Sequence, residues 1–185
     1  MKTPRVLVLP GWQGSGPAHW PMRWVAAHGY IVVEQHDWQR PLRGDWLMRL
    51  EEAVLDAPGE VALVAHSLGC HQVAAWAAHS CHGAKVRAAL LVAPADMQMP
   101  ALVHALPSWL PVARQRLPFK AVVVGSENDP YCSLDEAQAL ALEWGAQWVN
   151  LGPAGHTGFG ASGVAESKLG DWPQGLALLN ELLKD

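Results

Sequence analysis

One stretch near the middle of the chain constrains the fold more than any other. Residues 61–64 (VALV) are all apolar and rich in β-branched side chains, which is typical of a strand buried on both faces of a parallel sheet. Residues 72–78 (QVAAWAA) are rich in alanine and lack glycine and proline, which predicts a helix. Ser67 stands between these two runs, two positions from Ala65 and two from Gly69. The stretch therefore predicts a sharp strand-to-helix turn with a serine at its apex.

This turn has two interpretations. In a nucleophile elbow, G-x-S-x-G, small residues two positions either side let the backbone fold tightly and raise the serine Oγ above the sheet. Ala65 replaces the first glycine here, and it adds only one methyl group. In the other interpretation Ser67 merely caps the following helix, as serine often does in α/β proteins. The choice between them depends on residues further along the chain.

Composition limits the classes of protein to consider. A chain of 185 residues, half of them hydrophobic and 16% charged, predicts one domain over residues 1–185. The net charge of −4 and the scattered lysines and arginines argue against nucleic-acid binding. No apolar run approaches the roughly 20 residues of a membrane helix, and residues 1–10 lack a signal-peptide cleavage pattern. We expect a soluble, cytoplasmic protein without membrane association.

Cysteine usage argues against two kinds of framework. Cys70, Cys81 and Cys132 are odd in number and lack the spacing of metal ligands. We therefore expect neither a disulfide framework nor a metal site.

Strand and helix signals alternate along the chain, which predicts a three-layer α/β fold. Ser133 with Glu136 forms a capping-box pattern at the start of one of the helices. Chain order and crossover handedness predict a mainly parallel sheet of about six strands in the order 2-1-3-4-5-6, with residues 61–64 central. The expected strands are residues 5–9, 30–34, 61–64, 86–93, 121–125 and 147–151, and the expected helices include residues 17–28, 45–56, 72–78, 133–144 and 176–183.

Residues 94–118 differ in composition from the rest of the chain, because they combine many prolines with large apolar side chains. Five prolines divide the segment and forbid a long helix, yet its side chains are too apolar for a solvated loop. We expect a short cap whose Met97, Met99 and Trp109 line an adaptable apolar pocket. The alternative is a connection that only packs on the body of the domain.

A glycine-rich loop, residues 11–16 (GWQGSG), follows the first expected strand. It matches neither G-x-G-x-x-G nor the Walker A pattern, so we exclude a nucleotide site. Such loops also donate a backbone N–H to the oxyanion of a serine-hydrolase intermediate, and Trp12 would be the donor. His19, just beyond the loop, has two equally supported interpretations, a pocket residue or first-turn packing.

Ser67, Asp129 and His156 each follow an expected strand, in the order Ser…Asp…His. This is the order of α/β hydrolases and differs from those of the chymotrypsin and subtilisin types. A serine hydroxyl needs an imidazole to accept its proton, and the imidazole needs a carboxylate to fix its tautomer. Asp96 is the alternative acid. The remaining histidines, at helix ends or beside Ser67, are expected to be structural or solvated.

Several further stretches, spread over nearly the whole chain, match the sequence pattern of one family of hydrolases. They are Pro10-Gly11-Trp12-Gln13 with His19-Trp20, His66-Ser67-Leu68-Gly69-Cys70, Leu117-Pro118-Phe119, Asn128-Asp129-Pro130-Tyr131, and Gly155-His156 leading to Trp172-Pro173. In these the chain resembles the small serine-hydrolase family that includes retinoblastoma-binding protein 9 and the bacterial YdeN-type proteins. The resemblance implies a compact α/β-hydrolase fold with a minimal cap and a triad of Ser67, Asp129 and His156.

The expected function is therefore a cofactor-free and metal-free serine hydrolase that forms an acyl-enzyme on small esters or amides. Trp12 and Leu68 would supply the oxyanion-hole N–H groups, and Tyr131 would border a shallow pocket. The alternative is a non-enzymatic interaction module that keeps the fold, and an exposed apolar patch of Met97, Met99, Leu102 and Trp109 would favour it. The L-x-C-x-E motif linked to retinoblastoma-protein binding is absent, so no protein partner is indicated.

Overall fold

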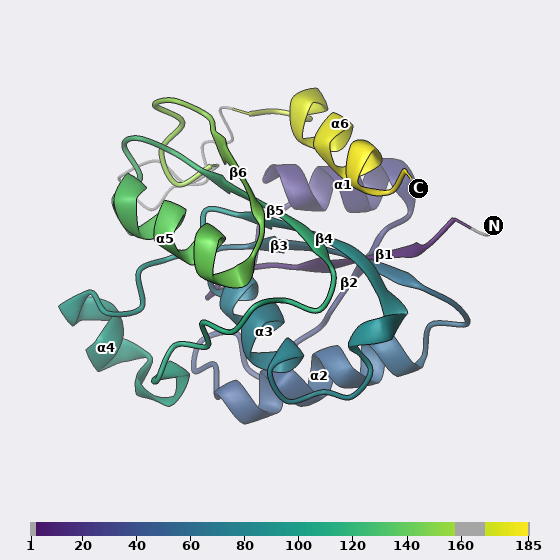
Figure 1. The fold of residues 1–185 in the computed structure, drawn as a ribbon, viewed down its shortest axis with the longest axis horizontal. Coiled ribbons are helices and arrows are strands. Elements are labelled where there is room, and N and C mark those ends of the chain that lie inside the picture. Colours follow the sequence, from purple (N-terminus) through teal and green to yellow (C-terminus); the bar gives the residue numbers. More distant parts are fainter. Residues whose placement is uncertain (1–2, 158–168, 185) are drawn as a thin grey trace.

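The computed structural model describes residues 3–157 and 169–184. Its centre is a six-stranded parallel sheet in the order β2-β1-β3-β4-β5-β6 (Figure 1). In that order the strands are Ile31–Val32, Arg5–Leu9, Val61–His66, Val86–Val92, Lys120–Gly125 and Gln147–Asn150. The predicted strand order is confirmed, and the strand before Ser67 lies in the middle of the sheet.

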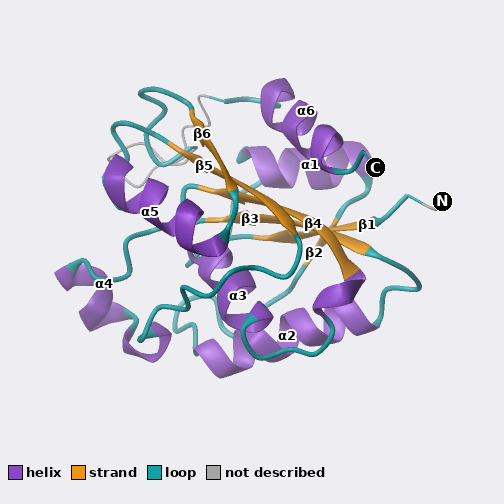
Figure 2. Ribbon diagram, viewed as in Figure 1, coloured by secondary structure: helices purple, strands orange, loops and turns teal. Residues whose placement is uncertain are grey.

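Helices cover both faces of the sheet and make three layers (Figure 2). Trp20–His28 (α1) and Pro173–Leu182 (α6) lie on one face, and Arg43–Leu55 (α2), Leu68–Ala77 (α3) and Leu134–Trp144 (α5) lie on the other. A short 3-10 helix, Gly83–Lys85 (η1), precedes β4. None of the helices in the described part of the chain is both long and apolar enough to cross a membrane.

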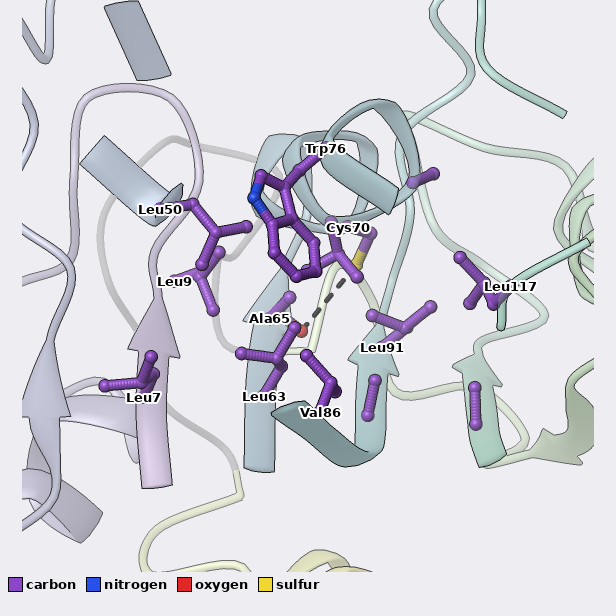
Figure 3. Packing of buried hydrophobic residues seen from close by; sticks show 14 of the residues in the cluster. Leu7, Leu9, Leu50, Leu63, Ala65, Cys70, Trp76, Val86, Leu91 and Leu117 are labelled. Carbon is purple, nitrogen blue, oxygen red and sulfur yellow. Dashed lines mark hydrogen bonds between the residues drawn. The ribbon is translucent and has the colours of Figure 1, made fainter. Parts of the chain in front are cut away.

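Side chains alternate along the strands, so each strand contributes residues to two separate hydrophobic cores, one on each face of the sheet. In β1, Leu7 and Leu9 face α2 and α3, whereas Val6 and Val8 face α1 and α6. Figure 3 shows the first core, where Trp76 of α3 lies over the strand residues. Because both faces of β3 and β4 are covered, these strands are apolar throughout, as the sequence pattern predicts.

Several element boundaries differ from expectation: α1 begins at Trp20, α2 at Arg43 and α6 at Pro173, against expected starts at residues 17, 45 and 176. The strand expected over residues 30–34 is reduced to Ile31–Val32, because this edge strand has a partner on one side only. Ser133 caps α5 as predicted and accepts a hydrogen bond from Glu136 N–H at 3.2 Å. The carboxylate of Glu136 pairs with Arg114 instead of completing the capping box.

Residues 94–118 form a small hydrophobic unit at the periphery of the molecule (Figure 1). Pro100–Ala105 (α4) and the 3-10 helix Pro107–Trp109 (η2) are its regular elements. Its apolar side chains are turned inward onto Trp46 and Leu68, and Met97, Leu102, Leu106 and Trp109 are all buried. The largest apolar side chains of the segment are therefore turned into the molecule, although Val103 remains exposed.

Candidate active site

Ser67 lies at the junction of β3 and α3 in a strained backbone conformation. Its φ of 54° and ψ of −119° belong to a region that residues other than glycine rarely adopt. Its own N–H donates to Val92 O at 3.0 Å, which ties the turn to the end of β4. Strain of this kind persists only where the surrounding structure imposes it, and it is the backbone geometry of a nucleophile elbow.

The small residues around Ser67 are required by close backbone contacts. A Cβ atom at Gly69 would lie 2.3 Å from Leu9 O, so α3 starts against the end of β1. A Cβ atom at Gly11 would lie 2.9 Å from the Cβ of Ser67. Ala65, by contrast, is fully buried in β3 with its methyl group accommodated in the core.

His156 connects Ser67 to Asp129 through hydrogen bonds. Its Nε2 lies 2.9 Å from Ser67 Oγ, and its Nδ1 lies 2.8 and 2.9 Å from the two oxygens of Asp129. The histidine and aspartate side chains are only 5% and 3% exposed. The alternative acid, Asp96, instead accepts a hydrogen bond from the N–H of Gln98 at 2.9 Å.

The loops that carry Asp129 and His156 are bonded to each other. Asn128 Oδ1 accepts the N–H of Gly155 at 2.7 Å, and Ser126 Oγ accepts the N–H of Ala154 at 2.9 Å. These bonds fix the relative position of the carboxylate and the imidazole. No role for Ser126 or Asn128 was predicted from the sequence. The available signal was the polar run that follows the apolar strand β5.

Two backbone N–H groups, of Trp12 and Leu68, belong to residues that line the cavity beside Ser67. Leu68 is the first residue of α3, so its N–H has no partner within the helix. Trp12 follows Gly11, which approaches Ser67 closely. Within residues 3–157 and 169–184, neither N–H donates to a protein acceptor.

The loop around Trp12 is held from the side by residues 38 and 39. The N–H of Gln13 donates to Trp38 O at 3.0 Å, and the indole N–H of Trp12 donates to Gln39 O at 2.9 Å. The loop is therefore fixed before any ligand binds, as electrostatic stabilisation of a developing charge requires.

A cavity of about 160 Å³ opens beside Ser67. Its wall is mostly apolar and comes from the residue 11–14 loop, the elbow, residues 95–106, and the Tyr131 and His156 loops. The lining residues are Gly11, Trp12, Gln13, Gly14, His66, Ser67, Leu68, Ala95, Met97, Leu102, Leu106, Tyr131 and His156.

Of the five expected pocket residues, the structure places Met97 and Tyr131 on the cavity wall. The other three lie behind or beside it. His19 is fully buried under the His156 loop, and Trp109 is buried against Trp46, with its indole N–H donating to Pro41 O. Met99 precedes α4 and packs on the same small cluster. Leu102 and Leu106 line the cavity in their place.

Three further histidines near the site are buried and neutral. Desolvation by burial lowers the pKa of His19 and of His71 from 6.5 to about 4, and it lowers the pKa of His66 well below its usual value. His71 Nε2–H donates to the carbonyl of Ala95 in the cavity wall at 2.6 Å. Among residues 3–157 and 169–184 no three His, Cys, Asp or Glu side chains are grouped so as to hold a metal ion.

The sheet order, the helix layers and the strained serine turn after the central strand define an α/β hydrolase. Within that class the chain belongs to the serine hydrolase family, which matches residues 6–181. The protein is therefore a hydrolase. Among functionally curated proteins, none matches the chain.

Solved structures share this fold at low sequence identity. A protein described as a YdeN-like hydrolase from Pectobacterium atrosepticum superimposes with a TM-score of 0.81 at 23% identity, over 97% of this chain and 90% of that one. The ydeN gene product of B. subtilis gives 0.75 at 19%, over 99% and 100%. The monoacylglycerol lipase of Paleococcus ferrophilus gives 0.66 at 11%, over 99% and 96%.

Proposed function

We propose that the protein hydrolyses small carboxylic esters or amides through an acyl-enzyme on Ser67. The observation that carries the proposal is the hydrogen-bonded chain from Ser67 Oγ to His156 Nε2, at 2.9 Å, and from His156 Nδ1 to Asp129, at 2.8 Å. Each residue has the chemistry that its place in this chain requires. The serine attacks, the imidazole carries the proton, and the carboxylate orients the imidazole.

Acylation begins when Ser67 Oγ attacks the substrate carbonyl carbon and His156 Nε2 accepts the hydroxyl proton. The carbonyl π electrons move to the oxygen, and the N–H groups of Trp12 and Leu68 stabilise the resulting charge. When the tetrahedral intermediate collapses, the bond to the leaving group breaks. His156 then returns the proton to the departing alcohol or amine. Asp129 stays ionised throughout and stabilises the imidazolium.

Deacylation repeats these steps with water as the nucleophile. His156 Nε2 removes a proton from water, and the hydroxide oxygen attacks the acyl carbon of the ester on Ser67. Collapse of the second intermediate breaks the bond to Oγ, and the proton returns to Ser67. The acid is released and the enzyme is restored.

The cavity favours small acyl groups. Its volume of about 160 Å³ is similar to the roughly 150 Å³ of an apolar cavity that holds one benzene ring. In this proposal residues 94–118 act as a short cap, because Met97, Leu102 and Leu106 close one side of the cavity. Short-chain or aromatic acyl groups fit this space and long chains do not. On p-nitrophenyl esters we expect activity to peak at short acyl chains; a peak at long chains would contradict this assignment.

Covalent labelling tests the proposed nucleophile directly. A fluorophosphonate should add one phosphonyl group to the wild-type protein, detected by intact mass, and none to Ser67→Ala. The kcat of Ser67→Ala on a p-nitrophenyl ester should fall by about 10⁴-fold or more, because the three residues act as a unit. A wild-type protein that resists the label, or a variant that accepts it, would refute the assignment.

The burial of the residue 97–109 segment supports the enzyme over the interaction-module alternative. An exposed apolar patch built from Met97, Met99, Leu102 and Trp109 would favour that alternative. Met97 and Trp109 are each 2% exposed and Leu102 is 7% exposed, so these side chains offer no such surface.

A further inference from the structure

Three ring N–H groups converge on the backbone of the His156 loop. His66 Nε2 lies 3.1 Å from the carbonyl oxygen of His156 itself. His19 Nε2 and the indole N–H of Trp20 lie 3.3 and 2.9 Å from the carbonyl oxygen of Thr157. All three side chains are buried, and they come from β3 and from the start of α1, far from His156 in sequence.

The acceptors determine the tautomers of these rings. A carbonyl oxygen only accepts, so Nε2 carries the proton in both His19 and His66. Burial keeps the imidazoles neutral, and the Nδ1 of His19 then accepts the hydroxyl proton of Ser15 at 2.9 Å. Each imidazole is therefore a fixed donor aimed at one carbonyl.

The backbone that receives these bonds is strained. Gly155 has a φ of 63° and Thr157 a φ of 46°, so His156 stands between two left-handed residues. Glycine adopts this conformation freely, but a β-branched threonine does so only when its surroundings impose it. The two bonds to Thr157 O supply that constraint.

We propose that His66, His19 and Trp20 are positioning residues that hold the His156 loop by its carbonyls and so align the imidazole with Ser67. The inference rests on the proposed function. Both histidines act through the backbone of the proposed base, because their Nε2 atoms lie beside the carbonyl oxygens of residues 156 and 157. The ring contacts agree with this arrangement, since His66 packs against His19 at 4.7 Å and against His156 at 4.9 Å between centroids. In this proposal the role of the motif His19-Trp20 is to hold the carbonyl of Thr157.

A matched pair of substitutions separates the N–H donor from the packing of the ring. His66→Phe keeps a ring but loses the donor, whereas His66→Gln loses the ring but keeps an amide N–H near the position of Nε2. We expect the kcat of His66→Phe to fall by about 10- to 100-fold with KM nearly unchanged, because a displacement near 1 Å costs up to that much. His66→Gln should retain most of the wild-type kcat. Equal impairment of the two variants, or a wild-type kcat in His66→Phe, would overturn the proposal.

A second readout does not depend on turnover. The proton between His156 Nδ1 and Asp129 should give a downfield NMR resonance that His156→Gln removes. This resonance should be lost or shifted in His66→Phe and in Trp20→Phe, and its chemical shift should be unchanged in His66→Gln. An unmoved resonance in both phenylalanine variants would refute the positioning role even if the enzyme is inactive. Conversely, a wild-type protein that resists the fluorophosphonate would refute the proposed function without moving this resonance.

Loss of stability alone must be distinguished from loss of alignment. Val54→Ala offers the control, because Val54 is fully buried in α2 on the opposite face of the sheet. This variant should melt at a lower temperature and keep the wild-type kcat at 25 °C. If His66→Phe does not fold, Trp20→Phe tests the same loop, with the same expected fall in kcat. Wild-type kcat and an unmoved resonance in Trp20→Phe would then overturn the proposal.

Discussion

Replacement of Gly69 by alanine tests the argument that the serine turn depends on contact between α3 and β1. The added Cβ would lie 2.3 Å from Leu9 O, 3.0 Å from Leu9 C and 3.1 Å from Pro10 O. All three are backbone atoms, so no side chain can move aside. The start of α3 must retreat by about 1 Å to reach ordinary contact, and Ser67 with Leu68 N–H must move with it.

Two magnitudes follow from this displacement. Overpacking of this kind costs roughly 1–3 kcal/mol of unfolding free energy, measured by urea denaturation. Misplacement of the nucleophile and an oxyanion donor by about 1 Å should lower kcat by about 10²-fold, measured on a short p-nitrophenyl ester. The rate of fluorophosphonate labelling should fall in parallel, because labelling uses the same serine and the same donors.

Gly44→Ala is the matched control for this experiment. Gly44 lies in α2, and a Cβ there would meet nothing within 4 Å. The control should keep its stability within about 0.5 kcal/mol, because Gly44 is exposed in the first turn of α2, and should keep full activity. If Gly69→Ala behaves like Gly44→Ala in both assays, the close-contact argument is wrong.

Three further predictions concern ionisation, capping and the proposed acid. Because folding lowers the pKa of His19 and His71 from 6.5 to about 4, the unfolded chain binds more protons between these values. The unfolding free energy should therefore fall with decreasing pH, by about 1.4 kcal/mol per pH unit for each histidine, with His66 acting in the same direction. Urea melts that are unchanged between pH 7 and pH 5 would contradict this. Ser133→Ala should cost about 1 kcal/mol through loss of the α5 cap, with no change in kcat; unchanged stability in a urea melt would show that the cap bond contributes nothing. Asp129→Asn should keep the fold, verified by circular dichroism, and lower kcat by about 10⁴-fold, because the amide favours the wrong tautomer of the imidazole; wild-type kcat would exclude it as the acid.

Much of the architecture could be predicted because it depends on local patterns. Continuous apolar runs mark β3 and β4, since both faces of a central parallel strand are covered. The turn at Ser67 is visible because the close approach of backbones requires glycine at residue 69, where a Cβ would lie 2.3 Å from Leu9 O. The edge strand β2 was predicted too long, since its pairing is limited by a neighbour on one side only.

The sequence by itself predicted the order of the strands, which the structure confirms, and the candidate set of Ser67, Asp129 and His156. Residues that follow parallel strands lie at the same edge of the sheet, so the strand pattern predicts that these three residues share that edge. Only the tertiary structure decided which side chains line the cavity, for example Leu106 in place of Trp109. It also decided that His19 donates to the backbone beside His156. Such contacts join segments more than 100 residues apart, and their partners are chosen by packing in three dimensions, which no local pattern records.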